Sequence, residues 1–112
     1  MIDTKKTLVT ALKKVQNNVL YESAVESPTL PLITYTTIDD SVHKQGNTLG
    51  YSNIKYQIKV WTTNVKELTK LTKSIDKELM AIGLQRTYYN ELKENEVIIG
   101  VMQYSGLTKE LF

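Results

Sequence analysis

Residues 56–64, YQIKVWTTN, change from a strand pattern to a helix pattern within a few positions, and this change constrains the fold more than any other feature. Ile54, Tyr56, Ile58 and Val60 alternate with polar residues, which is typical of a strand with one buried face and one solvated face. Such alternation favours an antiparallel sheet over a parallel sheet that is covered on both sides. We therefore expect helices on only one face of the sheet.

Trp61, the only tryptophan, comes at the end of this strand and falls on its polar face. We therefore expect Trp61 at the rim of the sheet, available for an edge or subunit contact and poorly placed for the core. Thr63 or Asn64 is a suitable N-cap for the helix that follows, and Glu67 occupies the capping-box position relative to Asn64.

The helix predicted after Asn64 ends near Gly83, a residue suited to the left-handed conformation that terminates helices. Its apolar residues recur at spacings of three or four and form one stripe, and four lysines lie on the opposite side. A lysine stripe can contact phosphates, but a position opposite the core stripe is more typical of a solvated surface. The apolar stripe is Leu68, Leu71, Ile75, Leu79 and Ile82, and the lysines are Lys66, Lys70, Lys73 and Lys77.

The remaining segments predict one more helix and three more strands. A helical stripe extends from Asp3 to about Leu20, and a linker with both prolines of the chain follows it. Gly100 indicates either a bulge or a close backbone approach within the last strand. Strands are expected at residues 32–38, 84–90 and 97–104, with loops at 39–50 and 91–96 and a C-terminal tail at 105–112.

These segments predict a single α+β domain over residues 1–112 in the order α–β–β–α–β–β. The sheet is expected to have four strands, mostly antiparallel, with two helices on one face. The loop at 39–50 is longer than a hairpin turn requires, and loops of this length are often mobile or functional.

Composition and charge exclude several functional classes. The chain has 14 basic and 12 acidic residues, and a net charge of +2 argues against binding to nucleic acid or a membrane surface. The absence of cysteine excludes disulfides, thiol catalysis and cysteine-based metal sites. The N-terminal stretch has no apolar run long enough for a signal peptide or a membrane span. We expect a protein that works in the compartment where it is made, or in an assembly built there.

No combination of residues predicts catalysis or metal binding. His43 is the only histidine, and a transition-metal site there would need Asp39 and Asp40 as further ligands. An enzyme would have to depend on His43 alone, because no recognisable nucleophile and base stand together. The segment GNTLG lacks the lysine and hydroxyl residue of a phosphate-binding loop. We therefore expect no catalytic residue, no metal and no cofactor.

Tyrosines on the predicted strands leave two interpretations open. Together with Arg86 and Lys59 they could stack on bases, or their rings could pack on the sheet while their hydroxyls contact water. The adjacent Tyr88 and Tyr89 must point to opposite faces, so one of them is expected in an interface. We expect the polar face of the sheet to be covered by another copy or another protein. The tyrosines in question are Tyr51, Tyr56, Tyr88, Tyr89 and Tyr104.

The order of these segments resembles the small tail-completion or tail-terminator proteins, also called tail-to-head joining proteins, of long-tailed bacteriophages and their prophages. The resemblance includes an N-terminal helix, the segment PLITYTTID and a long loop. The strand YQIKVWTTN then leads directly into the helix VKELTKLTKSIDKELMAIG, and a hairpin follows from RTYYNE to VIIGVMQY. The resemblance extends over nearly the whole chain and includes no catalytic motif.

The resemblance implies a structural role at the head-proximal end of the phage tail. Such proteins form a homo-oligomeric ring, a hexamer in the assembled tail, that contacts the major tail-tube protein and the head-completion or neck proteins. DNA passes through the ring as cargo, no membrane is involved, and assembly takes place in the host cytoplasm. Two alternatives remain open, a head-side neck or connector protein and a small nucleic-acid-binding α+β domain.

A ring of identical subunits requires one patch to contact a different patch on the neighbouring copy. We expect such contacts at the long loop, which the resemblance associates with assembly, at the polar sheet face and at the C-terminus. The candidate interface residues are Asp39, Asp40, His43, Lys44, Gln45, Trp61, Tyr89, Leu111 and Phe112.

Overall fold

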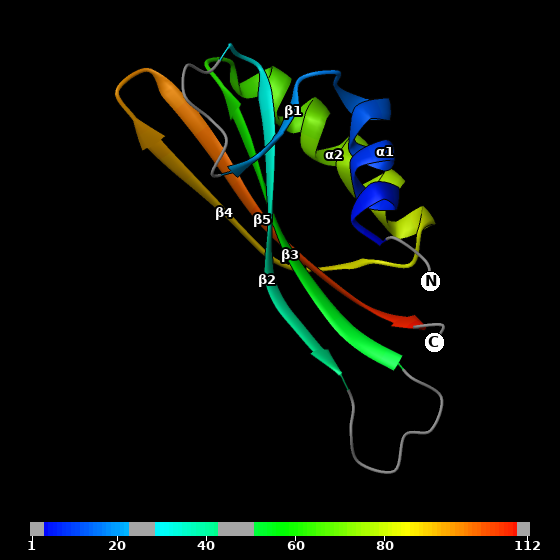
Figure 1. Cartoon of the computed structure of the whole chain (residues 1–112). Helices are drawn as coiled ribbons and strands as arrows, with labels where there is room; N and C mark the ends of the chain where they lie inside the picture. The colour runs from blue at the N-terminus through cyan, green and yellow to red at the C-terminus, as the bar shows by residue number, and fades with distance from the viewer. Residues whose placement is uncertain (1–3, 23–28, 43–50, 110–112) are drawn as a thin grey trace.

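The computed structural model describes residues 4–22, 29–42 and 51–109. Two helices, α1 (Thr4–Val15) and α2 (Val65–Ala81), lie on one face of a five-stranded sheet (Figure 1). The sheet order is β1-β2-β3-β5-β4, with β1 parallel to β2 and all other neighbours antiparallel. The strands are β1 (Val19–Tyr21), β2 (Leu32–Val42), β3 (Tyr51–Thr62), β4 (Gln85–Glu94) and β5 (Val97–Lys109).

The α+β class is confirmed, but the prediction of a four-stranded sheet is wrong. The first helix ends at Val15 rather than near Leu20, and residues Val19–Tyr21 form β1 instead. This short strand pairs in parallel with residues 33–35 of β2 and makes the sheet mixed. Val19 belongs to the hydrophobic core, as it would in a longer helix, so its apolar character did not distinguish the two structures.

Two strands extend into segments that the sequence assigned to a loop and a tail. β2 continues to Val42, so Asp39 and Asp40 lie in a strand rather than in the predicted loop. β5 continues to Lys109, so residues 105–109 belong to the sheet rather than to the predicted tail. In both cases the added residues, DDSV and SGLTK, lack the alternating apolar pattern on which the prediction rested.

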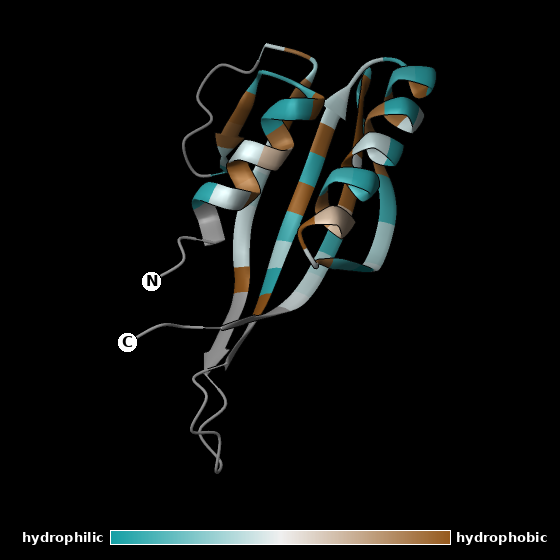
Figure 2. Cartoon of the chain, turned by 90° about the vertical axis from the view of Figure 1, so that its right-hand side faces the viewer, coloured by the Kyte–Doolittle hydropathy of each residue, from teal (hydrophilic) through white to brown (hydrophobic). Residues whose placement is uncertain are grey.

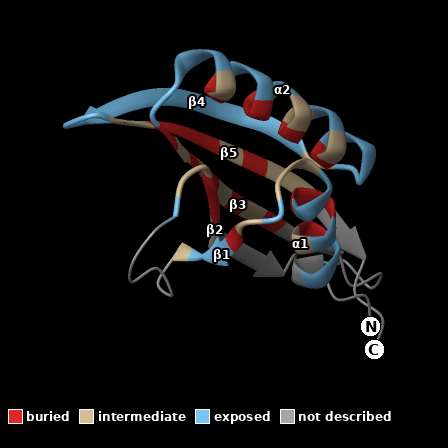
Figure 3. Ribbon diagram, turned by 90° about the horizontal axis from the view of Figure 1, so that it is seen from above, coloured by how far each residue is buried: buried red, intermediate tan, exposed pale blue. Residues whose placement is uncertain are grey.

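β4 is also longer than predicted. It runs to Glu94, and a two-residue turn at Asn95 and Glu96 replaces the expected loop over residues 91–96. Asn95 has a φ of 56°, in the left-handed region that asparagine tolerates better than most residues. Every residue of β4 is exposed, which explains why no apolar alternation marks the strand (Figure 3).

The predicted ends of α2 are confirmed. The Asn64 side chain accepts hydrogen bonds from the backbone N–H groups of Lys66 and Glu67, at 2.8 and 3.2 Å. Gly83 has a φ of 93°, and the Leu84 N–H donates back to the Leu79 carbonyl at 3.0 Å. 

The capping-box role expected of Glu67 is not observed. Its carboxylate instead accepts the hydroxyl hydrogen bond of Thr62 at 2.5 Å, and the backbone N–H of Asn64 donates to the Thr62 hydroxyl at 3.2 Å. The end of β3 is thereby tied to the first turn of α2.

The core lies between the helices and the sheet, where Figure 3 shows buried residues beneath α1 and α2. Figure 2 shows hydrophobic and hydrophilic residues alternating along the sheet behind the helices. The helices contribute Leu8, Ala11, Leu12, Leu68, Leu71, Ile75 and Leu79 to this core, and the sheet contributes Val19, Ile33, Ile54, Tyr56, Ile58, Val60, Met102 and Tyr104.

Gly100 allows α2 to pack closely on β5. A Cβ at this position would lie 2.8 Å from Leu68 Cδ1, closer than a real Cβ contact allows. The pairing of β5 with β3 and β4 shows no register shift there. Of the two expectations for this glycine, the close approach is therefore confirmed and the bulge is wrong.

A polar network also joins α2 to the sheet. The buried Tyr104 donates its hydroxyl hydrogen bond to Asp76 of α2, and Arg86 of β4 forms an ion pair with the same carboxylate at 3.2 Å. Burial raises the pKa of Tyr104 above its usual range, and the hydrogen bond and charge of Asp76 act in the same direction.

Candidate interaction surface

The face of the sheet opposite the helices, here called the open face, contains an apolar row across four strands. Leu32 and Ile99 in this row are 0% and 3% exposed, although both lie outside the core cluster beneath the helices. Leu92, on the edge strand β4, is 46% exposed. The row is thus buried at Leu32 and Ile99 and exposed at the β4 edge. In register order it consists of Leu32, Trp61, Ile99 and Leu92.

Trp61 lies on the open face, opposite the core-facing Val60, as the alternation predicts. Its Nε1 donates a hydrogen bond to the Thr34 hydroxyl of β2 at 3.0 Å. The Lys59 ammonium lies 5.9 Å from the centre of the Trp61 ring and forms an ion pair with Glu22 at 2.5 Å. Trp61 is therefore half-buried and fixed by neighbours on two sides. Its face was predictable from the sequence, but these contacts were not. Trp61 lies near the end of the central strand β3, with paired strands on both sides, rather than at an edge of the sheet.

The two adjacent tyrosines of β4 point to opposite faces, as predicted. Tyr88 pairs with Gln103 on the open face, whereas Tyr89 pairs with Met102 on the α2 side. The Tyr89 hydroxyl donates to Glu91 at 2.7 Å, and Arg86 lies 5.4 Å from the Tyr89 ring centre. Desolvation and the Glu91 hydrogen bond raise the pKa of Tyr89 to about 12. Its role in an interface remains a prediction, and the tyrosine on the open face is Tyr88.

The other candidate interface residues are only partly described. Asp39 and Asp40 pair with Lys55 and Ile54 in the β2–β3 ladder. The remaining candidates, namely His43, Lys44, Gln45, Leu111 and Phe112, lie outside the described residues, as does the part of the predicted loop from 43 to 50.

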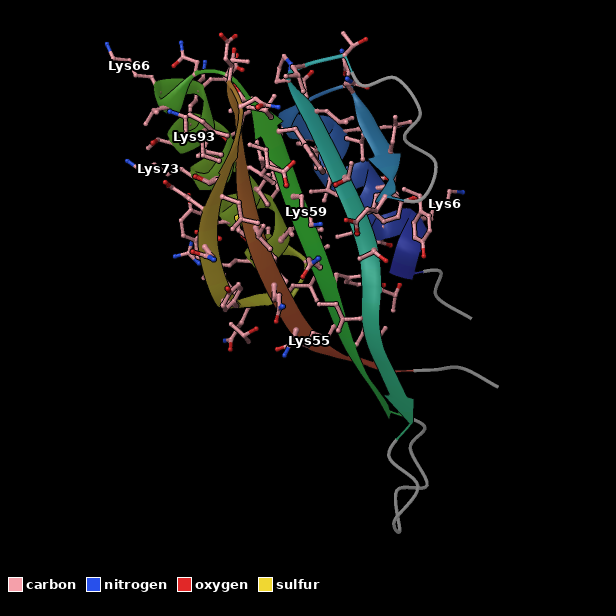
Figure 4. The ribbon with its side chains drawn as sticks, turned by 90° about the vertical axis from the view of Figure 1, so that its left-hand side faces the viewer. Lys6, Lys55, Lys59, Lys66, Lys73 and Lys93 are labelled. Carbon is pink, nitrogen blue, oxygen red and sulfur yellow. The ribbon has the colours of Figure 1, made fainter. Side chains whose placement is uncertain are left out.

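The placement of aromatic and basic residues weakens the base-stacking interpretation. Tyr56 and Tyr104 are buried on the helix side and offer no ring to a nucleic acid. Arg86 and Lys59 both form ion pairs within the chain. Figure 4 views the open face, on which Lys55 and Lys59 lie along β3. The four lysines of α2 are exposed, which agrees with an ordinary solvated helix surface.

Across residues 4–22, 29–42 and 51–109, no cluster of three or more histidine, aspartate or glutamate side chains is arranged to hold a metal ion. The same residues include no helix that is long and apolar enough to cross a membrane.

Most of the apolar row was not predicted from the sequence. Of its members, only Trp61 was expected on the polar side of the sheet, and Leu32, Ile99 and Leu92 were assigned to no surface. One signal was present, because the segment VIIGV at the start of β5 is apolar at consecutive positions. Consecutive apolar residues in a strand indicate cover on both faces.

Comparison with known proteins gives a likeness of fold. No protein-family model matches the chain, and no curated protein matches it. The fold matches a chain in a solved structure described as the virion of a native gene transfer agent (GTA) particle, with a TM-score of 0.62. The match covers 88% of this chain and 84% of that chain at 11% sequence identity. The two chains share a fold. At this identity, the likeness extends to the architecture over nearly the full length of both chains and no further.

Proposed function

We propose that this protein is a structural component of a phage or phage-like virion that forms a ring at the head-proximal end of the tail tube and joins tail to head. The observation that supports it most is the likeness in fold to a chain of the gene transfer agent virion, over 88% of this chain. The finer role rests on the order of segments, which resembles tail-terminator proteins. In this role the chain performs no catalysis and needs no cofactor.

The proposed partners are further copies of the chain, the major tail-tube protein and the head-completion or neck proteins. A hexameric ring matches the resemblance, and DNA passes through it as cargo. The open face supports this role because its apolar row ends at β4 in the exposed Leu92, and Tyr88 is exposed on the same face of that strand. Large exposed apolar side chains next to one another are typical of surfaces that bind other proteins.

Assembly with the tail-tube protein tests the proposal. We expect the purified chain to form rings at high concentration, and to stop tube growth when it is mixed with the tube protein of the same genome. Electron microscopy of tube length and light scattering of the chain alone measure the two effects. Bovine serum albumin at the same mass concentration is the control for crowding of the tube protein. A strict monomer that leaves the tube length unchanged would contradict the proposal.

Binding of the same purified chain to the neck protein and to the tube protein distinguishes the proposed role from the head-side alternative. A chain that binds the neck protein but neither binds the tube nor changes its length would support a head-side connector instead. Binding to both proteins, in either order of addition, is the outcome expected of a protein that joins tail to head.

A further inference from the structure

The two edge strands of the sheet expose more large hydrophobic side chains than the rest of the described chain. Of the nine large hydrophobic residues that are exposed in the described part of the chain, five lie on β1 and β4, each between 38% and 46% exposed. β1 and β4 are the outermost strands of the sheet within the described residues. An edge strand with apolar side chains and unpaired backbone groups is a template for pairing with another chain. The five residues are Leu20 and Tyr21 on β1, and Tyr88, Tyr89 and Leu92 on β4.

The strand directions fit a contact between these two edges. β1 runs parallel to β2, and the three antiparallel pairings that follow make β4 run opposite to β1. When a second copy continues the sheet in the same orientation, its β1 meets β4 of the first copy in antiparallel fashion. This contact joins two different patches, so it repeats from copy to copy and builds a ring or a filament.

The side chains at the two edges also match. One cross-strand row on the helix side begins at Tyr21 and ends at Tyr89, and the next row, on the open face, begins at Leu20 and ends at Asn90. If the sheet continues without a register shift, Tyr21 of one copy faces Tyr89 of the next. Directly opposite and diagonal neighbours contact each other across strands, and aromatic pairs are favourable there. The full first row is Tyr21, Tyr35, Ile58, Met102 and Tyr89.

We propose that β4 of one copy pairs antiparallel with β1 of a second copy, with Tyr21 against Tyr89 and Leu20 between Tyr88 and Leu92. Each edge is therefore expected to bind the opposite edge of a second copy. The strand directions, the cross-strand rows and the apolar side chains of the two edges all match such a contact. This inference rests on the proposed function, since it names the subunit contact of the ring. β1 has only three residues, so the contact offers few backbone hydrogen bonds and depends on protein concentration.

Paired cysteines test this contact directly. The chain has no cysteine of its own, and β1 lies four strand spacings from β4 in one copy, roughly 19 Å at ~4.8 Å per spacing. Disulfides need Cα atoms within about 7 Å, so a bond between the two strands must join two copies. Under oxidation, we expect Tyr21→Cys/Tyr89→Cys to give a ladder of covalent oligomers. A mixture of the two single variants should give dimers that contain one copy of each.

A matched control separates this contact from random collision. Tyr21→Cys/Lys73→Cys places the second thiol on the exposed side of α2, and we expect no ladder from it. Leu20→Cys/Asn90→Cys tests the neighbouring row independently, in case the first pair alters the fold. Circular dichroism measures whether each variant is folded. The reactions are run at high concentration, with and without the tail-tube protein.

Two outcomes would overturn the inference. Dimers of Tyr89→Cys alone, formed as efficiently as the double-variant ladder, would show a two-fold β4–β4 contact instead. Cross-linking of both cysteine pairs no stronger than that of the control would show that the edges do not meet.

The result is also separable from the proposed function. If the wild-type protein forms rings on tube ends but the cysteine variants do not cross-link, the proposed function stands and the β4–β1 contact is wrong. If the cysteine variants give a ladder but the protein does not bind the tube, the contact stands and the proposed function is wrong.

Discussion

The indole nitrogen of Trp61 donates a hydrogen bond to the Thr34 hydroxyl at 3.0 Å, and this bond joins β3 to β2 on the face of the sheet that the helices leave open. Thr34 is only 1% exposed, so the bond is shielded from water. The Trp61 side chain also lies in the apolar row, between Leu32 and Ile99. Trp61 therefore has a structural role within the subunit as well as a position suited to a subunit contact.

Substitution of Trp61 separates these two roles. We expect Trp61→Ala to lower the free energy of unfolding by about 2 kcal/mol, below the 3–5 kcal/mol typical of a fully buried tryptophan. We expect ring formation to be impaired more than folding. Urea denaturation measures folding, and light scattering measures oligomer formation. Trp61→Phe is the control that keeps an aromatic side chain but removes the hydrogen-bond donor. A loss above ~3 kcal/mol in the monomer would show that Trp61 serves mainly the fold.

Gly100 provides a test of helix–sheet packing. We expect Gly100→Ala to destabilise the protein by about 1–3 kcal/mol, because its Cβ would overlap Leu68 Cδ1 at 2.8 Å. Leu68→Val shortens that side chain, so the double variant should lose less than the sum of the two single losses. Denaturant titration of the four proteins gives the coupling between the sites. Strict additivity would mean that the close approach is not what disfavours a side chain at position 100.

The tyrosine hydroxyls predict a loss of stability at alkaline pH. The folded-state pKa of Tyr89 is about 12, above its ordinary value of 10.0, and that of Tyr104 is raised as well. A raised pKa in the folded state means that the unfolded chain loses its proton first. The stabilisation is therefore complete below pH 10 and decreases as the pH rises from 10 through 12.

Thermal melting across this pH range measures the effect. Tyr89→Phe should flatten part of the decrease, and Tyr89→Phe/Tyr104→Phe should flatten more of it. Tyr88→Phe is the matched control, because it removes a hydroxyl from the same strand and leaves the hydrogen bonds to Glu91 and Asp76 in place. An equal change in all three variants would mean that the hydrogen bonds to Glu91 and Asp76 are not its cause.

Nucleic-acid binding is expected to be weak and nonspecific. Lys59 and Arg86 are neutralised by Glu22 and Asp76, and the buried Tyr56 and Tyr104 are unavailable for stacking. Single- and double-stranded probes should migrate unchanged at physiological salt in a gel-shift assay. Tight binding that weakens steeply with salt would support the small nucleic-acid-binding domain instead.

The local features of this fold were predictable from the sequence. The alternation before Trp61, the Asn64 cap and Gly83 together identified β3, α2 and both ends of that helix. Each of these signals acts over a few residues, because strand alternation, caps and left-handed glycines depend on the backbone nearby.

Only the tertiary structure decided the features that depend on distant partners. Residues 19–21 form the strand β1 because they pair with the edge of β2. β4 is a strand because β5 supplies its hydrogen bonds. The bond from Trp61 to Thr34 and the position of Tyr21 and Tyr89 at the two ends of one row follow from strand register. A sequence specifies which faces of a strand are apolar, but pairing between remote segments decides what those faces and edges meet.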